Sequence, residues 1–190
     1  MRKIIGDITG TLTVCAVVVF SAFAAQGDDE LKAESKQALT NFKNADSTLA
    51  TYFANSAGYA VFPSVGKGGF IVGGARGKGM VFDKDGTVIG QSTMTQANIG
   101  AQAGGQTFAQ LLLFQNQAAL DNFKSGKFSL GADISAVVAS EGASKNARFK
   151  QGIAVFTLPT KGLMVQATVG GQKFSFQPEA MQPTGRTEPK

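Results

Sequence analysis

The sequence of 190 residues contains no histidine, and Cys15 is its only cysteine. Cys15 lies in a segment that we expect to be removed, which would leave a mature chain with neither residue type. Disulfide bonds, thiol nucleophiles, histidine general bases and zinc sites with histidine or cysteine ligands are then excluded. Asp133 stands alone within a patterned segment, without a second acid at an evident spacing. We therefore predict no catalytic residues, no metal site, no cofactor and no enzymatic activity.

The N-terminal segment has the features of a secretory signal peptide. Two basic residues precede an apolar run at 8–23, and Ala22-Phe23-Ala24 offers an A-x-A cleavage site. The run is short for a membrane-spanning helix, which needs roughly 20 apolar residues, so an uncleaved anchor is the weaker alternative. Lipoprotein anchoring through Cys15 is disfavoured because Val14 stands where a lipobox needs a small residue. We predict a signal peptide at 1–24 and a periplasmic or cell-envelope location.

Negative charge is scarce in the part of the chain that we expect to fold into strands. Residues 52–178 contain 11 Lys and Arg against 5 Asp and Glu, whereas residues 25–51 are net acidic. A basic surface on an exported protein favours anionic partners, and lipid head groups are more accessible there than nucleic acid. We expect an anionic phospholipid membrane as partner and no nucleic acid, with an acidic envelope protein as the alternative.

The segment at 25–53 has helical periodicity. Acidic residues at 28–30 suit a helix start, and apolar residues recur on one face from Leu31 to Phe53. Ser47 is a candidate break, because Asp46-Ser47 can cap a second helix. A basic row lies beside the apolar face and consists of Lys32, Lys36 and Lys43. Such an amphipathic helix either packs on its own domain or contacts a membrane.

From Gly58 onward, short runs rich in Val, Ile and Phe alternate with glycine-containing turns. We expect a central strand at 107–114, a short helix at 116–124 and an alternating strand at 128–138. Tight turns are expected at 84–86 and 159–162, and a polar loop at 141–151.

These patterns predict an α+β fold. It would be a mainly antiparallel β sandwich or barrel-like sheet with an N-terminal amphipathic helix and a short internal helix. The β-rich domain would cover 54–178, after the helical segment at 25–53, and 179–190 would form a disordered tail.

Glycine and positive charge coincide between Pro63 and Phe82. We predict a tight β-hairpin there with a hinge at 73–79, presenting the cations Lys67, Arg76 and Lys78. The hinge has the composition of a nucleotide loop, but it lacks G-x-x-x-x-G-K-[ST] and continues as strand instead of opening a helix. Its backbone amides and cations suit a phosphate head group, and a purely structural hairpin is the alternative.

Several segments, taken in their order, resemble the SYLF domain family. They are AGYAVFPSVGKGGFIVGGARGKGMV, ANIGAQAGGQTFAQLLLFQNQAALDNFKSGKFSLGADISAVV and GIAVFTLPTKGLMVQATVGG. The resemblance implies phospholipid binding through basic residues and an amphipathic helix ahead of the domain. In eukaryotic members it implies phosphoinositides and, in some, actin. The exported, bacterial style of this chain argues against both as its natural ligands.

We therefore expect a non-enzymatic module that binds anionic phospholipid at a bacterial membrane surface. The alternatives are a structural or protein-interaction domain of the envelope, and a carrier of an apolar lipid behind the charge-free stretch at 86–120. The residues expected to contact lipid are Lys67, Arg76, Lys78, Lys32, Lys36, Lys43, Lys145, Arg148 and Lys150.

Overall fold

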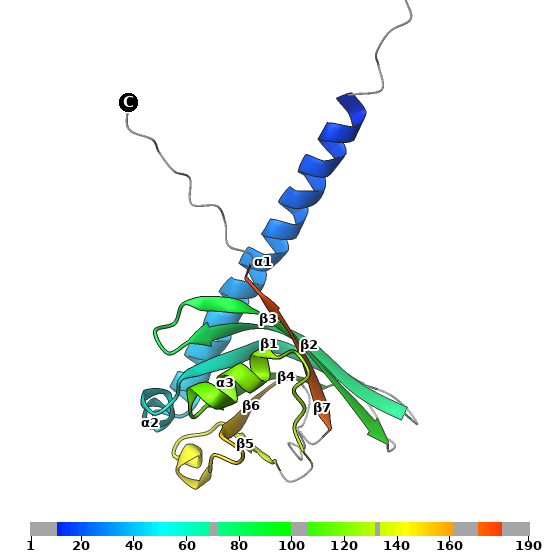
Figure 1. Ribbon diagram of the computed structural model, residues 1–190. Coiled ribbons are helices and arrows are strands. Elements are labelled where there is room, and N and C mark those ends of the chain that lie inside the picture. Colours follow the sequence, from blue (N-terminus) through cyan, green and yellow to red (C-terminus); the bar gives the residue numbers. More distant parts are fainter. Residues whose placement is uncertain (1–10, 69–71, 100–105, 132–133, 162–170, 180–190) are drawn as a thin grey trace, which may run out of the picture.

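The computed structural model describes residues 11–68, 72–99, 106–131, 134–161 and 171–179. Its helices are α1 (Thr11–Ala45), α2 (Leu49–Ala54) and α3 (Gln117–Lys124), with a 3₁₀ turn, η1 (Ala143–Asn146). The strands are β1 (Gly58–Gly68), β2 (Val72–Asp83), β3 (Val88–Ile99), β4 (Gln106–Phe114), β5 (Ala136–Val138), β6 (Ile153–Lys161) and β7 (Gln172–Pro178). Figure 1 shows one sheet with α1 behind it and α3 in front.

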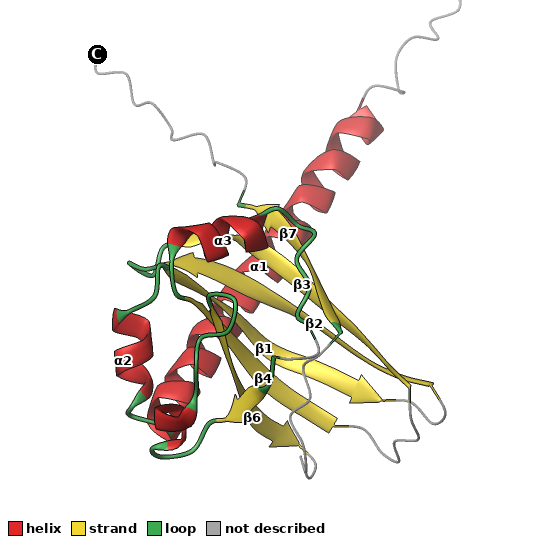
Figure 2. Ribbon diagram, turned by 60° about the horizontal axis from the view of Figure 1, so that its bottom comes forward, coloured by secondary structure: helices red, strands yellow, loops and turns green. Residues whose placement is uncertain are grey.

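The strands form a seven-stranded sheet in the order β5-β6-β4-β1-β2-β3-β7. The pairings are antiparallel except for the parallel pair β5–β6. The predicted α+β, mainly antiparallel fold is confirmed, in the form of a single open sheet. Figure 2 shows how strongly this sheet coils.

Each face of the sheet has its own hydrophobic cluster. The α1 face carries residues such as Val61, Met80 and Leu111, which pack against the helices α1 and α2. The opposite, inner face carries Phe62 and Leu112 and is covered by α3. Successive strand residues point to opposite faces, so both faces of the central strands are apolar.

The inner face holds an aromatic core with a polar layer beside it. Phe123 of α3 lies 4.9 Å from Phe114 and 5.4 Å from Phe174, measured between ring centroids. Beside the rings, the Gln110 amide donates to Gln172 at 2.7 Å, and the Gln172 amide donates to Gln110 at 3.0 Å and to Gln96 at 3.2 Å. Three strands separate β4 from β7 in the sheet order, so coiling brings these amides together. Rings and hydrogen-bonded amides thus pack this side of the sheet.

Helix α1 docks on the sheet through its apolar face. Ala38 and Phe42 are buried, as is Leu49 at the start of α2. The expected break near Ser47 is present, because α1 ends at Ala45 and α2 begins at Leu49. The expected start near the acidic cluster at 28–30 is wrong, since α1 begins at Thr11. No helix in the described part of the chain has the length and apolar character needed to cross a membrane.

Several local predictions are confirmed. The central strand appears as β4, and the short helix appears as α3, where the side chain of Asn116 accepts from the Ala119 amide at 2.9 Å. Helix α3 is followed by Gly126 at φ +74°, a conformation that favours glycine. At the turn 84–86, Gly86 has φ +84° and the Asp83 carboxylate accepts two backbone amides.

Other local predictions are wrong in part. Among the described residues of the alternating segment 128–138, only β5 is a strand, although Phe128, Leu130 and Ile134 are buried against the inner face as the alternation requires. Burial therefore follows the pattern without continuous strand pairing. The turn expected at 159–162 is wrong for its first three residues, because β6 continues through Pro159, which pairs with Phe108, to Lys161. Asp133 lies outside the described residues.

Candidate functional site

The glycine-rich segment 73–79 is strand, so the hinge predicted there is wrong. Its residues pair with both β1 and β3, for example Gly77 with Val65 and with Met94. The β1–β2 connection falls at 69–71, outside the described residues. Glycine here serves close packing: a Cβ on Gly79 would lie 2.4 Å from the Val61 carbonyl oxygen and 2.7 Å from the Phe62 ring. Glycine-rich sequence is typical of turns, but it also suits a strand such as β2, which lies opposite the register shift in β1.

Arg76 and Lys78 lie on the α1 face of β2, and both are exposed. Arg76 pairs with Thr95 of β3, and Thr95 pairs in turn with Lys173 of β7. Paired residues of an antiparallel sheet point to the same face, so Lys173, also exposed, joins the two cations of β2. We name Arg76, Lys78 and Lys173 the strand cation row.

The strand cation row stands among small side chains. Lys78 pairs with exposed Ser64 on one side and with Thr93 on the other, and Ser175 of β7 is exposed beyond Thr93. Within the described part of the chain, no ion pair holds any of the three cations. The long basic side chains are therefore the parts of this surface best placed to meet an anion.

Lys173 was not among the predicted site residues. The sequence KFSFQ indicates which of its residues are buried, and Phe174 is 3% exposed as expected. It does not show that β7 pairs with β3, and only that pairing places Lys173 in line with Arg76, with Thr95 of β3 between them. Lys67 is placed by backbone register opposite Ala75 and Gln106, and its side chain lies outside the described part.

The lysines of α1 lie on the flank of the helix that faces away from this row. Lys32 lines a hollow with Met80 and Val88, and the Lys43 ammonium lies 5.0 Å from the centroid of Phe53. The other flank presents Glu34, which lines a hollow with Ser64, the register partner of Lys78. Helix α1 therefore separates Lys32, Lys36 and Lys43 from the strand cation row.

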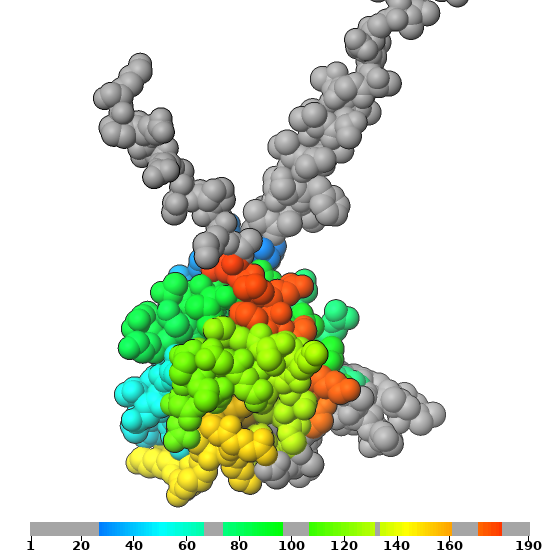
Figure 3. All heavy atoms as spheres, viewed as in Figure 1, coloured from blue at the N-terminus to red at the C-terminus, as the bar shows by residue number. Residues whose placement is uncertain are grey.

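The third predicted group lies beside α2. Lys145, Arg148 and Lys150 are all exposed around η1. The Arg148 guanidinium donates through Nη1 to the carbonyl oxygens of Ala147, at 2.7 Å, and Lys145, at 3.1 Å. The Tyr52 hydroxyl also donates to the Ala147 carbonyl, at 2.7 Å, which ties the basic loop to α2. Figure 3 shows α2 in cyan beside the yellow segment around η1 at the surface.

A pair of carboxylates fastens the α1–α2 break to the loop before η1. Asp46 is fully buried, and its carboxylate accepts from the backbone amides of Thr48, Gly142 and Ser144 at 3.0, 3.2 and 2.7 Å. Glu141 accepts from the hydroxyl of Ser47 at 2.7 Å. We name Asp46 and Glu141 the carboxylate clasp. Burial raises the pKa of Asp46, but hydrogen bonds from Thr48 and Ser144 outweigh it and leave that pKa below its ordinary value.

The lowered pKa of Asp46 predicts a loss of stability in acid. A carboxylate whose pKa is lower in the folded state stabilises the fold above the pKa of the unfolded chain, and this contribution is lost as the pH falls through the folded-state pKa. We expect the unfolding free energy of the protein to fall below about pH 4 more steeply than that of Asp46→Asn. Urea unfolding at a series of pH values tests this, and parallel pH profiles for the two proteins would contradict it.

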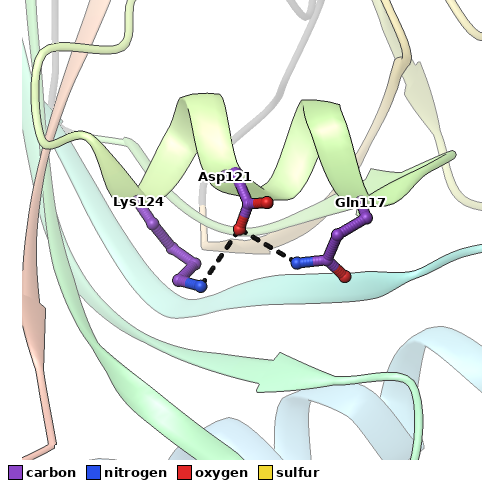
Figure 4. A network of polar contacts seen from close by, with 3 residues as sticks. All are labelled: Gln117, Asp121 and Lys124. Atoms are coloured by element: carbon purple, nitrogen blue, oxygen red, sulfur yellow. Dashed lines mark hydrogen bonds and ion pairs between the residues drawn. The ribbon is translucent and has the colours of Figure 1, made fainter.

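Helix α3 carries a paired charge instead of a free one. The Lys124 ammonium and the Gln117 amide both donate to Asp121, at 3.1 and 2.9 Å (Figure 4). Hydrogen bonds from Lys124 and Gln117 hold the pKa of Asp121 below its usual value. Among the described residues, no cluster of three or more His, Cys, Asp or Glu could hold a metal ion.

Comparison with known proteins agrees with a binding domain. Residues 95–182 match the family model Ysc84, a SYLF-domain model described as "Las17-binding protein actin regulator". Beta cell expansion factor A of Aeromonas veronii is 26% identical over 137 residues, covering 72% of this chain and 52% of that protein. The chain thus spans about half the length of this relative. The resemblance inferred from the sequence is confirmed, and the family supports a non-catalytic domain of the lipid-binding or actin-regulator-like kind.

Proposed function

We propose that this protein is a non-enzymatic module that binds anionic phospholipid at a bacterial membrane surface through the strand cation row. The observation that carries the proposal is the register of β2, β3 and β7, which gathers Arg76, Lys78 and Lys173 on one exposed face. Each cation near an anionic lipid surface contributes about 1 kcal/mol, so three together give binding that is detectable and sensitive to salt.

The other two predicted basic groups are separate from the proposed contact surface. The row on α1 and the loop around η1 lie apart from the strand cation row, and the proposal assigns membrane contact to the strand cation row alone. Docking of α1 through Ala38 and Phe42 leaves its apolar face unavailable for membrane insertion while the helix stays bound. Head-group attraction, and not helix insertion, is therefore the proposed mode of contact. The proposal retains the envelope location, which fractionation of cells and N-terminal sequencing of the recovered protein test.

Cosedimentation with lipid vesicles tests the proposed function. We expect the protein to bind phosphatidylglycerol or cardiolipin vesicles, to bind phosphatidylcholine vesicles weakly, and to release from the former as salt rises. The double variant Arg76→Ala, Lys78→Ala should weaken binding roughly 25-fold, because two contributions of about 1 kcal/mol are lost.

A charge-matched variant controls for the change in net charge. Lys84→Ala with Lys124→Ala removes the same charge from exposed positions away from the strand cation row, at the β2–β3 turn and on α3. This control should retain nearly the full affinity, and circular dichroism should show both variants folded. Equal losses in both double variants would contradict a defined site. Equal and negligible binding to anionic and neutral vesicles would instead favour the protein-interaction or carrier alternatives.

A further inference from the structure

We propose that a pocket between α2 and η1 binds a single anionic amphiphile of the fatty-acid type, one molecule at a time and without a membrane. The pocket has a volume of about 460 Å³, within the range of 300–1,000 Å³ that is typical of small-molecule sites. It lies beside the basic loop and is separate from the strand cation row, so this inference does not depend on the proposed membrane surface.

The floor of the pocket is apolar and aromatic. Tyr52 and Phe149 both line it, with ring centroids 5.3 Å apart, and the buried Phe156 supports Tyr52 from within the core at 5.4 Å. The hydroxyl of Tyr52 is already satisfied by the Ala147 carbonyl, so Tyr52 offers the pocket the apolar part of its ring. Such a floor suits a hydrocarbon chain, because burying apolar surface is favourable and no polar group of the floor is left unpaired.

The rim of the pocket is positively charged. Lys145 and Arg148 both line it and both are exposed, whereas none of its lining residues carries a carboxylate. Two carbonyl groups of the loop accept from Arg148 Nη1 and hold the guanidinium in place. A guanidinium has five donors, so others remain for a ligand, and a carboxylate or phosphate matches their geometry. A positive rim above an apolar floor selects an anionic head with a hydrocarbon tail.

The two walls of the pocket are fastened together before any ligand arrives. Thr48 at the foot of α2 hydrogen-bonds to Ser144 of η1 through their hydroxyl groups, and Asp46 accepts from the amides of both residues. Because these contacts link segments almost a hundred residues apart, the pocket is formed by the fold itself. A preformed site loses little conformational freedom on binding.

Laurate binding, measured by saturation-transfer NMR on the ligand at concentrations below its micelle-forming concentration, tests this inference. We expect laurate to bind, and dodecanol and dodecyltrimethylammonium to bind at least tenfold more weakly, since neither can pair with the cationic rim. Lys145→Ala should weaken laurate binding about tenfold, the loss expected for one hydrogen bond to a charged group. Lys127→Ala, which removes an exposed lysine outside the pocket, should bind laurate as the unmodified protein does.

A pocket-filling variant checks the location. Thr51 is exposed and lines the pocket, so Thr51→Trp should block laurate without disturbing the buried core. Asn55→Trp, at another lining residue, serves if Thr51→Trp fails to fold. Arg76→Ala with Lys78→Ala should bind laurate normally, and Thr51→Trp should bind vesicles normally, so each site can fail without the other. No laurate binding, equal binding of all three probes, or full laurate binding by a folded pocket-filling variant would overturn the inference.

Discussion

Replacing Asp46 by alanine is expected to lower the free energy of unfolding by about 3 kcal/mol. The substitution removes the acceptor for backbone amides of Thr48, Gly142 and Ser144, and leaves one buried and two partly buried donors without their partner. An unsatisfied buried donor costs about 1–3 kcal/mol, and Asp46 serves several at once. Because the chain has no tryptophan, unfolding in urea is best followed by far-ultraviolet circular dichroism.

The other half of the carboxylate clasp provides the matched control. Glu141 is exposed and accepts from Ser47, so water can replace it when its charge is removed. Glu141→Gln should cost less than about 1 kcal/mol. If Asp46→Ala were no more destabilising than Glu141→Gln, the buried carboxylate would not be what joins the α1–α2 break to η1.

Replacing Gly79 by alanine is expected to destabilise the protein by about 3 kcal/mol, an effect of overpacking. Strand β1 has a register shift between Val61 and Ser64, and Gly79 of β2 lies opposite that irregularity. The new methyl group would meet the Val61 carbonyl oxygen at 2.4 Å and the ring of Phe62 at 2.7 Å. Contacts this short require the backbone to move, and overpacking of this kind costs about 1–3 kcal/mol or more.

Gly66 in β1 is the control for Gly79. It is exposed, and a Cβ built there meets no atom within 4 Å. Gly66→Ala should therefore change stability by less than about 0.5 kcal/mol. A shift of the urea midpoint confined to Gly79→Ala would support close packing as the role of this glycine. Equal shifts for both variants would point instead to the general cost of altering a glycine-rich hairpin.

The sequence identified most residues of the candidate site, but it could not show which of them lie together on one surface. Arg76 and Lys78 stand out because they are basic residues in an otherwise small and apolar segment, and both are exposed. Their neighbour Lys173 could not be found in the same way, since it comes almost a hundred residues later and reaches them only through β3. Nor could the sequence show that α1 separates its own lysines from this row.

The pocket beside η1 illustrates the same limit. The polar segment 141–151 does not indicate that Tyr52 of α2 packs against it, because Tyr52 comes almost a hundred residues earlier in the sequence. Asp46 was read only as a cap for the second helix, whereas it also binds amides of Gly142 and Ser144. Hydrogen bonds between distant segments leave no periodic signal in the sequence.

The sequence by itself determined the resemblance to the SYLF domain, the α+β class, the central strand, the short helix and the turn at Gly86. These features follow from local periodicity, from backbone preferences of single residues, and from an ordered set of segments. The tertiary structure decided that the glycines at 73–79 lie inside a strand, that α1 docks through its apolar face, and that the basic residues form separate groups. Strand register and helix docking settle those questions, because they depend on contacts between residues far apart in the chain.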